Sequence, residues 1–346
     1  MKSLIYGYGE TGKSFERYLI KKKLKYDIFD INIPELNKKN KLKSYNQILC
    51  SPGIPKEIFE NLKKDNKNVL TDIDIFFKED NSIKIGITGT NRKSTTAYHL
   101  HQLFNINSSS NLIGNIGNTM LDYINNNKDY SVIELSSFQL DKMKKNNLDY
   151  GILLNIDIDH LDYHGDFELY KLAKEKILQA KESISFEMDP YRLFHWITKS
   201  KAEEIEFKNL PYRFESISKR IINDSKSTNS HSLFYALKKA NKVFDSEYIL
   251  IVCGDPKKEK FREIFIDGPS EILIFGQHLN ELNKCIKNTN KHSFETLQEL
   301  FNYIKNKNKS QNILFSPGYP SGKDYKNFIE RGEVFNSFAK YVNENI

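Results

Sequence analysis

Cysteine and long apolar runs are both scarce in this sequence. The 346 residues include only three cysteines, Cys50, Cys253 and Cys285, which lie far apart and outside any C-x-x-C pair. This usage argues against a disulfide framework or a zinc site and favours a reducing compartment. No stretch approaches the roughly 18 uninterrupted apolar residues of a membrane span. The first residues read as a strand and a glycine turn rather than a signal peptide. We therefore expect a cytoplasmic protein with no membrane partner.

The composition is that of a folded chain with a modest positive charge. Hydrophobic residues make up 39% and aromatic residues 12%, which is enough apolar material for real cores and excludes a largely disordered chain. There are 52 Lys and Arg against 45 Asp and Glu, a net charge of +7. The lysines are scattered rather than clustered, so we expect no nucleic-acid partner. The charge would suit an anionic substrate, and we expect a monomer.

Strand-like runs alternate with amphipathic stretches almost throughout the chain, which predicts an α/β fold with parallel sheets. Helices are expected at Lys13–Lys23, Ser94–Phe104 and Tyr170–Lys181. A polar stretch at residues 78–82 precedes a fresh strand, and a new alternation begins near Pro211. These changes predict three domains, residues 1–80, 81–210 and 211–346.

The first motif with chemical meaning is the turn that contains Gly7, Gly9 and Gly12. It follows a strand-like run and opens a helical stretch, the context in which G-x-G-x-x-G cradles a diphosphate at a helix N-terminus. Asp30 closes the next strand, where a ribose-binding acid would lie. The motif predicts a nucleotide-binding turn without specifying the diphosphate. A glycine turn used only for packing is the alternative.

A second motif, GITGTNRKSTT, joins a strand to a helix at Gly86–Thr96. Backbone N–H groups and the helix dipole would face a phosphate there, Lys93 would add a positive charge, and the Ser94 hydroxyl could hold Mg²⁺. The motif is not a literal G-x-x-x-x-G-K-[ST], because Arg92 stands at the last glycine position.

Two further strand ends carry ionisable residues. Glu134 closes the apolar run SVIE, where a carboxylate would supply a hard oxygen ligand for Mg²⁺ beside the phosphate loop. The alternative is a solvated acid at a strand end. In DIDHLDYH, His160 and His164 lie among three aspartates after another apolar run, which favours a metal or phosphate role over the structural role of most single histidines. Lys174 follows on the next helical stretch, where a solvent-facing lysine is the alternative to a role at the metal site.

Taken together and in this order, the motifs resemble those of the Mur ligases, ATP-dependent amide ligases that add amino acids to UDP-N-acetylmuramoyl precursors of peptidoglycan. GITGTNRKSTT is similar to the pattern of the whole family, whereas IELSSFQL, INDSKSTN and SPGYPSGKDYKNFIERG resemble its D-glutamate-adding branch. The resemblance covers nearly the whole chain. It implies a Rossmann-like first domain that binds the UDP substrate, a P-loop ATPase-like central domain and a Rossmann-like third domain. It also implies ATP and Mg²⁺, with D-glutamate joined to UDP-N-acetylmuramoyl-L-alanine through an acyl phosphate.

The resemblance assigns roles residue by residue. It implies that four residues serve catalysis, with Lys174 carbamylated by CO₂: Lys93, Glu134, His160 and Lys174. The implied metal ligands are Ser94, Glu134, His160 and the modified Lys174. The implied ATP-binding residues are Gly89, Thr90, Asn91, Arg92, Lys93, Ser94, Thr95, Asn223, Lys226, Asn229, Asp255 and Lys257. The implied substrate-binding residues are Gly9, Thr11, Asp30, Ser51, Gly53, Asn115, Ser136, Gln139, Ser321 and Phe328.

Two departures from the family pattern leave alternatives open. Arg92 replaces a glycine, which would cost about 1 kcal/mol or more if the position has positive φ; its side chain would otherwise point outward or contact a phosphate. The stretch between Lys181 and Leu210 is short and shows neither further central-domain strands nor the expected HNxxN helix. This fits a trimmed but working ligase, or a relative that binds nucleotide without catalysis. A nicotinamide-dependent dehydrogenase is supported only by the first glycine turn and Asp30.

Overall fold

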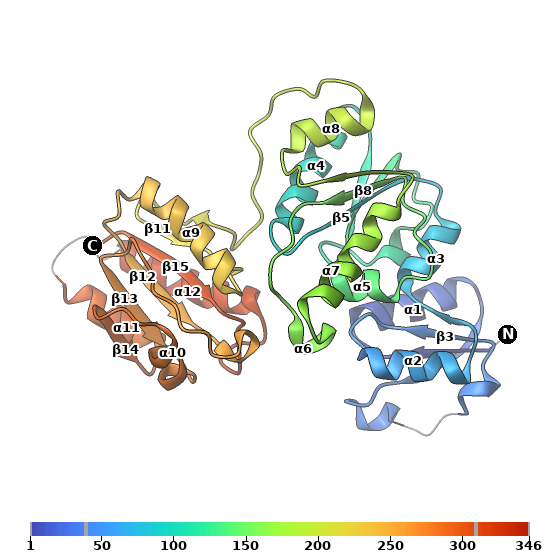
Figure 1. Ribbon diagram of the computed structural model, residues 1–346, viewed down its shortest axis with the longest axis horizontal. Coiled ribbons are helices and arrows are strands. Elements are labelled where there is room, and N and C mark those ends of the chain that lie inside the picture. The colour runs from blue at the N-terminus through green and yellow to red at the C-terminus, as the bar shows by residue number, and fades with distance from the viewer. Residues whose placement is uncertain (1, 38–40, 308–310, 345–346) are drawn as a thin grey trace. The chain divides into compact units, whose positions relative to one another are not determined.

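Three mainly parallel sheets, each covered by helices, make up the chain (Figure 1). A computed structural model describes residues 2–37, 41–307 and 311–344. The chain divides into two compact units, Met1–Lys208 and Asn209–Ile346. The predicted α/β class with parallel sheets is therefore confirmed. The finer division of the first unit at residue 80 stays a prediction.

The first sheet has the order β2-β1-β3-β4 and is parallel throughout. The first helix begins within the glycine turn, three residues earlier than the sequence suggested, because Gly9 serves as its N-cap in extended conformation. The elements are β1 (Lys2–Tyr6), α1 (Glu10–Lys21), β2 (Lys25–Phe29), β3 (Gln47–Cys50), α2 (Lys56–Asp65), β4 (Val69–Leu70) and α3 (Asp72–Glu79), with short 3₁₀ turns at Pro34–Leu36 and Leu42–Ser44.

The second sheet has the order β6-β7-β5-β8-β9, again parallel, with the strand of the GITGTNRKSTT motif at its centre. The predicted helix from Tyr170 to Lys181 is instead an α-helix followed by a 3₁₀ turn at Lys176–Gln179. The elements are β5 (Ile83–Thr88), α4 (Lys93–Asn107), β6 (Ser110–Gly114), a 3₁₀ turn (Met120–Tyr123), β7 (Tyr130–Glu134), α5 (Ser137–Lys142), β8 (Tyr150–Leu153), α6 (Leu161–His164), α7 (Phe167–Glu175), β9 (Glu182–Ser185) and α8 (Pro190–Thr198).

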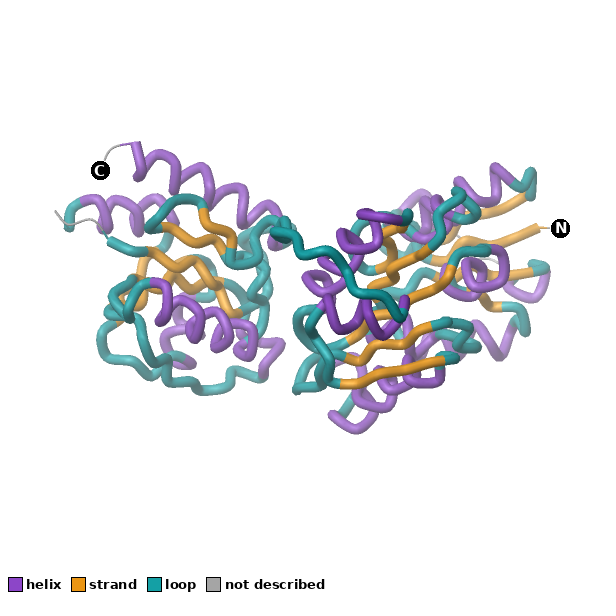
Figure 2. The backbone as a smooth tube through the Cα atoms, turned by 90° about the horizontal axis from the view of Figure 1, so that it is seen from above, coloured by secondary structure: helices purple, strands orange, loops and turns teal. Residues whose placement is uncertain are grey.

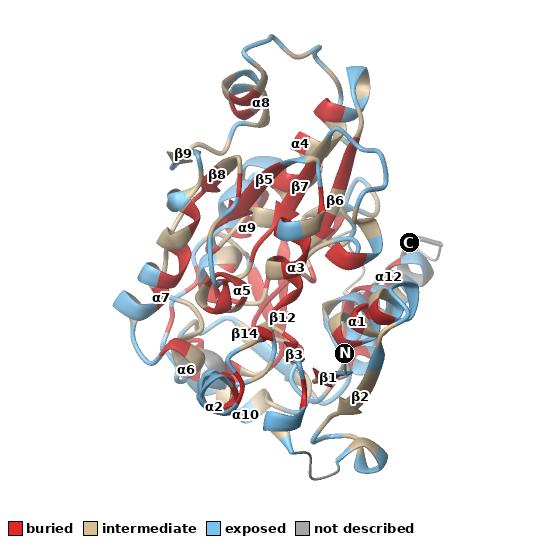
Figure 3. Cartoon of the chain, turned by 90° about the vertical axis from the view of Figure 1, so that its right-hand side faces the viewer, coloured by how far each residue is buried: buried red, intermediate tan, exposed pale blue. Residues whose placement is uncertain are grey.

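The first two sheets share a hydrophobic core, which explains why they form one unit. Along β8, Ile152 packs with α4 and α8 on one face, whereas Leu153 points into the core on the other. That second core also contains Ile5 and Leu49 from the first sheet. Because alternate strand residues point to opposite faces, each strand contributes to two separate layers. Figure 3 shows the strands of this unit as its most buried part.

The short stretch after Lys181 contains more regular structure than its sequence suggested. β9 joins the central sheet at its edge, and α8 begins at Pro190 with the Asp189 side chain as its N-cap. The expectation of no further central-domain strand is therefore wrong. Residues 199–210 have no helix or strand and link the two units (Figure 2). Part of this link packs on the first unit, where Phe207 stacks on His99 with ring centroids 4.3 Å apart.

The second unit contains a six-stranded sheet in the order β10-β11-β15-β12-β13-β14, in which only the short β10 is antiparallel to its neighbour. Leu250 and Val252 pack on one face of β12, and Ile249 and Ile251 pack on the other. The elements are β10 (Glu215–Ser216), β11 (Ile221–Asn223), α9 (Ser230–Val243), β12 (Ile249–Cys253), a 3₁₀ turn (Pro256–Glu259), β13 (Glu271–Phe275), α10 (Leu279–Cys285), β14 (Lys291–Phe294), α11 (Leu297–Lys305), β15 (Ile313–Gly318) and α12 (Phe328–Glu344).

The three cysteines are free and buried. Among the described residues, none of the helices combines the length and the apolar character needed to cross a bilayer.

Close packing around β8 generates a stability prediction. A Cβ at Gly151 would lie 2.2 Å from the Ile177 carbonyl oxygen, a backbone atom that cannot move aside easily. We expect Gly151→Ala to lower the free energy of unfolding by about 2 kcal/mol, as overpacking of a core does. Gly53→Ala is the control, because a Cβ there meets nothing within 4 Å. Urea denaturation of both variants measures the difference, and equal midpoints would contradict the packing described here.

Candidate active site

The phosphate-loop motif lies where β5 ends and α4 begins. The Lys93 side chain folds over this loop, and its Nζ donates to the carbonyl oxygens of Gly89 at 2.7 Å and Thr90 at 2.9 Å. Ser94 is buried in the first turn of α4. The unpaired N–H groups and the dipole of a helix N-terminus attract anions. The arrangement is therefore suited to hold phosphate groups beside a positively charged side chain.

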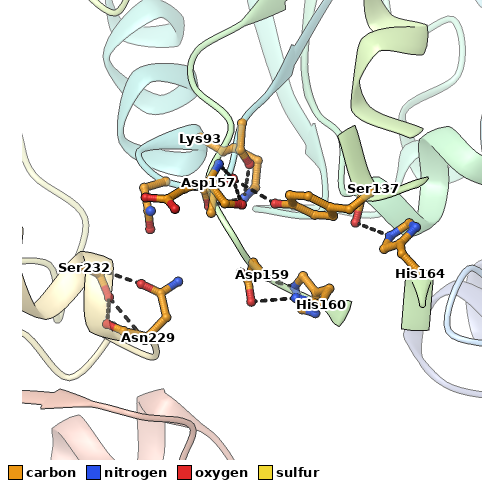
Figure 4. A network of polar contacts seen from close by, with 12 residues as sticks. Lys93, Ser137, Asp157, Asp159, His160, His164, Asn229 and Ser232 are labelled. Carbon is orange, nitrogen blue, oxygen red and sulfur yellow. Dashed lines mark hydrogen bonds and ion pairs between the residues drawn. The ribbon is translucent and has the colours of Figure 1, made fainter. Parts of the chain in front are cut away.

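The loop is held in place by the segment that follows β8 (Figure 4). The Asn155 side chain accepts a hydrogen bond from the Asn91 N–H at 2.9 Å and donates to the Asn91 carbonyl at 3.0 Å. Thr90 Oγ1 accepts from the Asp157 N–H at 2.9 Å and lies 2.9 Å from the Tyr170 hydroxyl. The sequence-based site did not include Asn155. Its position directly after an apolar strand, in line with the phosphate loop, is the signal that could have found it.

Arg92 adopts the left-handed conformation, with φ 65° and ψ 1°, and caps α4 without a side-chain hydrogen bond to the helix. The sequence predicted a cost for Arg92 if φ is positive, and φ is positive here. A non-glycine residue in this region costs about 1–2 kcal/mol, so the loop carries local strain.

Glu134 ends β7 beside β5 and is 1% exposed, so it is not a solvated acid at a strand end. Its Oε1 accepts a hydrogen bond from Asn115 Nδ2 at 2.8 Å. Its Oε2 is also buried and makes no hydrogen bond to any described residue. A buried carboxylate oxygen without a partner is costly unless something binds it. Asn115, predicted to contact substrate, has its side chain on this carboxylate.

The two histidines of the DIDHLDYH motif differ in their surroundings (Figure 4). His160 is partly exposed, adopts φ 52°, and has its Nε2 3.6 Å from Asp159 Oδ2. His164 is buried, with its Nε2 2.9 Å from the Ser137 hydroxyl. Phe138 lies between them, with its ring 4.8 Å from that of His160 and 5.8 Å from that of His164. His160 is therefore the histidine of the pair that a ligand could reach.

Lys174 is 1% exposed on α7, so it is not a solvent-facing lysine. Its Nζ donates to the Gly89 carbonyl oxygen at 2.8 Å and to Thr88 Oγ1 at 3.4 Å. Burial, and then the nearby charge of Lys93, hold the pKa of this amine well below its usual range. Glu134 and Asp159 act in the opposite direction, but burial dominates. A buried amine with a lowered pKa therefore lies beside the phosphate loop.

The residues present fit a magnesium site that depends on ligands from outside the chain. Among the described residues, no group of three or more His, Cys, Asp or Glu side chains could hold a metal ion. Mg²⁺ is commonly held by one or two carboxylates together with substrate phosphates and water. The unpartnered Oε2 of Glu134 beside the phosphate loop meets that requirement.

The first glycine turn is closed by hydrogen bonds with the side chains of Asp30 and Ser51. Asp30 accepts from the Tyr8 N–H at 2.7 Å and the Asn32 N–H at 2.8 Å, so both carboxylate oxygens hold backbone. Ser51 Oγ donates to the Gly7 carbonyl oxygen at 2.7 Å. A Cβ at Gly12 would lie 2.2 Å from that same oxygen, which explains the need for glycine. Three more of the predicted substrate-binding residues belong to this region: Gly9, Thr11 and Gly53. A Cβ built at Gly9 or at Gly53 would meet no atom within 4 Å.

Ser136 and Gln139 form a capping box at the start of α5, and the Gln139 Oε1 accepts from both the N–H and the hydroxyl of Ser136. Their side chains therefore fix the helix that follows Glu134. A contact with substrate stays a prediction for both.

The predicted residues of the second unit lie around the loops that follow β11, β12 and β15. The Asn223 side chain is fully buried and donates to the Gly332 carbonyl and to Asn336 Oδ1, so it serves the interior of the unit. Asn229 forms a capping box with Ser232 at the start of α9 (Figure 4). Lys226 Nζ lies 4.0 Å from the centre of the Phe328 ring. Of the others, Asp255 accepts from the Lys257 N–H, Lys257 is exposed and Ser321 is buried.

A pocket of about 700 Å³ lies at the opposite end of the central sheet, where β5 and β7 begin. It is lined mainly by Asn, Asp and Ser, and none of the predicted site residues lines it. Asp80 in its wall already accepts from the N–H groups of Ser82 and Asn125. This pocket is separate from the candidate active site.

Comparison of the sequence with protein-family models finds a match that includes the candidate active site. The family model described as the Mur ligase middle domain matches residues 87–249, a range that contains the phosphate loop, Glu134, His160 and Lys174. Over this range, 163 of its 346 residues, the chain is similar to the Mur ligases. The match begins within β5 and runs beyond Lys208 into β12, so it spans the end of the first unit and the start of the second.

Curated relatives agree over nearly the whole length. The chain is 27% identical to a protein named UDP-N-acetylmuramoylalanine–D-glutamate ligase from Francisella philomiragia subsp. philomiragia, over 96% of this chain and 95% of the relative. It is also 27% identical to a protein of the same name from Francisella tularensis subsp. tularensis, over 99% and 97%. The first alignment has 399 positions, more than this chain has residues, so the relative contains residues that this chain lacks.

Solved structures support the same fold. The ligase MurC of Thermotoga maritima superposes with a TM-score of 0.58 at 15% identity, over the full length of both chains. The MurF ligase of the same organism, in complex with ADP, superposes with a TM-score of 0.61 at 13% identity, over 99% of this chain and 95% of that one. The expected Mur ligase-like architecture is thus confirmed as a fold.

The strain at Arg92 can be measured by comparing two variants that both remove the guanidinium group. Alanine keeps the Cβ that disfavours positive φ, whereas glycine does not. We expect Arg92→Gly to be more stable than Arg92→Ala by about 1 kcal/mol in chemical denaturation. A more stable Arg92→Ala variant would show that the left-handed conformation at this position is not a source of strain.

Proposed function

We propose that this chain is an ATP-dependent ligase that joins D-glutamate to UDP-N-acetylmuramoyl-L-alanine through an acyl phosphate. The names of its curated relatives support this choice of substrates. The observation that carries the proposal is the convergence of Lys93, the unpartnered oxygen of Glu134 and the buried amine of Lys174 around one phosphate loop. Because the proposed reaction uses ATP and a UDP-linked precursor, we also propose a cytoplasmic enzyme that acts as a monomer.

The chain's own residues would act mainly by position and charge. In the proposed reaction the substrate carboxylate attacks the γ-phosphorus of ATP, ADP leaves, and the amine of D-glutamate then displaces phosphate from the acyl phosphate. Lys93 would leave the carbonyls of Gly89 and Thr90 and bind the ATP phosphates. Its positive charge would there offset the negative charge that develops on the phosphates during transfer. The first turn of α4 would hold the β- and γ-phosphates in line with the attacking carboxylate.

Mg²⁺ would supply charge neutralisation on the phosphates when bound. Ser94 and Glu134 are the residues we propose to hold it, together with phosphate oxygens and water. His160 and Lys174 are the proposed residues of a second metal site. In its unprotonated form, which a lowered pKa favours, the Lys174 amine could attack CO₂, forming an N–C bond and losing a proton, which leaves a carbamate with two oxygen donors. An ammonium at the same place would instead repel a cation.

Two alternatives have weaker support. A relative that binds nucleotide without catalysis was suggested by Arg92 and by the short stretch after Lys181. The central sheet nevertheless keeps five strands with β5 in the middle, and the loop keeps Lys93 and Ser94. A nicotinamide-dependent dehydrogenase is supported only by the first glycine turn and Asp30, and it would not need the phosphate loop with Lys93 and Ser94.

The proposed reaction makes a direct prediction for the purified chain. We expect phosphate release from ATP to require both UDP-N-acetylmuramoyl-L-alanine and D-glutamate, with L-glutamate giving little or none. A coupled phosphate assay measures this, and product mass confirms the new amide. Failure to release phosphate, with both nucleotides bound, would favour the non-catalytic relative. Binding of NADH at the first turn without competition from UDP would favour the dehydrogenase.

The carbamate on Lys174 predicts chemical rescue. We expect Lys174→Ala to lower the rate of phosphate release by at least about a hundredfold, since it removes an electrostatic group at the reacting phosphates. Because a short carboxylic acid can occupy the space of the lost carbamate, acetate or formate should restore part of this activity. Lys93→Ala is the matched control, since no added acid replaces a positive charge. Full activity of Lys174→Ala without added acid would overturn the modification.

A further inference from the structure

Lys142 is a buried lysine of the first unit that the proposed reaction does not use. It ends α5, is 3% exposed, and its Nζ donates to two backbone carbonyl oxygens, those of Pro52 and Ile54. α5 belongs to the central sheet layer, whereas Pro52 and Ile54 belong to the loop between β3 and α2 of the first sheet. The contact therefore ties together two layers that are distant in sequence.

The loop held by Lys142 consists of Ser51, Pro52, Gly53 and Ile54, and we call it the 51–54 loop. On its other side it is fastened to the glycine turn, because Ser51 Oγ donates to the Gly7 carbonyl oxygen at 2.7 Å. Within the loop, the Ile54 N–H donates to the Ser51 carbonyl at 3.2 Å. Ser51 and Gly53 are proposed to bind the uridine substrate. The Ser51 N–H also donates to the Tyr6 carbonyl at 3.0 Å, so the Ser51 end of the loop is fastened to β1 and the turn, whereas Lys142 holds Pro52 and Ile54.

The other end of α5 reaches the proposed ATP site. Its cap, Ser136, lies two residues after Glu134, and the helix is only six residues long. Phe138 on this helix packs against the rings of His160 and Tyr163, at 4.8 and 4.4 Å. Lys142 Nζ itself lies 5.2 Å from the centre of the Tyr163 ring. One short, rigid helix therefore carries contacts to both proposed sites.

The surroundings of Lys142 explain why it holds carbonyls tightly. It lies among Cys50 of β3, Phe59 of α2 and Tyr163 of α6, where hydrogen-bonding water is scarce. Its neighbour Asp141 forms an ion pair at 3.0 Å with Lys56, at the start of α2. This ion pair is a second polar contact between α5 and the segment that follows the 51–54 loop. Bonds from a charged amine to carbonyl oxygens in such a place are stronger than neutral ones.

We propose that Lys142 is a positioning residue, which holds the 51–54 loop in the conformation that binds the uridine nucleotide. The inference rests on the proposed function for the identity of the substrate. It does not rest on catalysis, since Lys142 touches none of the proposed reacting groups.

The pH dependence of substrate binding distinguishes a role for the charge of Lys142 from a role in packing alone. Burial lowers the pKa of its amine to about 8, whereas burial raises the pKa of the Cys50 thiol to about 12 and also raises that of the Tyr163 hydroxyl. The charges of Asp141 and Lys56 flank the amine. Between pH 7 and pH 9 the ammonium loses its proton, and its bonds to the loop carbonyls weaken.

The test compares Lys142→Met with Lys145→Met, an exposed lysine on the same segment whose loss changes the net charge equally. We expect Lys142→Met to bind UDP-N-acetylmuramoyl-L-alanine about tenfold more weakly in calorimetry, with ATP affinity unchanged and Lys145→Met like the wild type. Lys142→Arg should recover part of the affinity, because a guanidinium also donates to two carbonyls. The advantage of the wild type over Lys142→Met should shrink between pH 7 and pH 9.

Amide hydrogen exchange of the 51–54 loop separates this inference from the proposed reaction. Faster exchange in Lys142→Met than in Lys145→Met, together with weaker binding of the uridine nucleotide, supports the positioning role. Unchanged exchange would overturn it, whatever the activity. Faster exchange with unchanged binding would overturn the role in substrate binding. If the wild type binds the uridine nucleotide but releases no phosphate with D-glutamate, the proposed reaction fails while the positioning role stands.

Discussion

The parallel pairing of β5 with β7 on one side and β8 on the other is the constraint on which the candidate active site depends. Ile87 pairs with Glu134, and Thr88 pairs with Leu153, so the carboxyl ends of the three strands arrive at one edge of the sheet. Parallel sheets place their functional loops at that edge. The phosphate loop, the buried carboxylate and the segment from Asn155 to His160 are neighbours for this reason, although up to about 70 residues separate them in sequence.

A second constraint is the core shared by the first two sheets. Ile5 and Leu49 of the first sheet pack in the same cluster as Ile133 and Leu153 of the second. Burial of this apolar surface joins the two layers, and Lys142 adds a directed polar contact across them. The sheets of the first unit therefore have a defined arrangement relative to each other.

Burying polar groups at the edge of the central sheet lowers the stability of the protein, and the fold does not require these groups there. Lys174 is buried with a lowered pKa, Glu134 keeps one oxygen without a partner, and Arg92 adopts a strained conformation. Sites that perturb charges and backbone in this way are typical of function, because a packing role would be served by apolar residues at lower cost. The three features lie on or beside one loop, which is a stronger indication than any of them alone.

The sequence by itself determined the α/β class, the position of the phosphate loop and the resemblance to the Mur ligases, because strand–helix alternation, turn glycines and short motifs are local patterns. It also placed Lys93, Glu134 and Lys174 among the important residues, but it left open whether Glu134 and Lys174 were exposed. Only the tertiary structure decided this, since burial depends on what packs above a residue. The contacts of Asn155 and Lys142 likewise could not be predicted, because each joins segments brought together by sheet order and a shared core. The helix at Tyr170 and the strand after Lys181 were misjudged because a 3₁₀ turn and a short edge strand leave weak periodic signals.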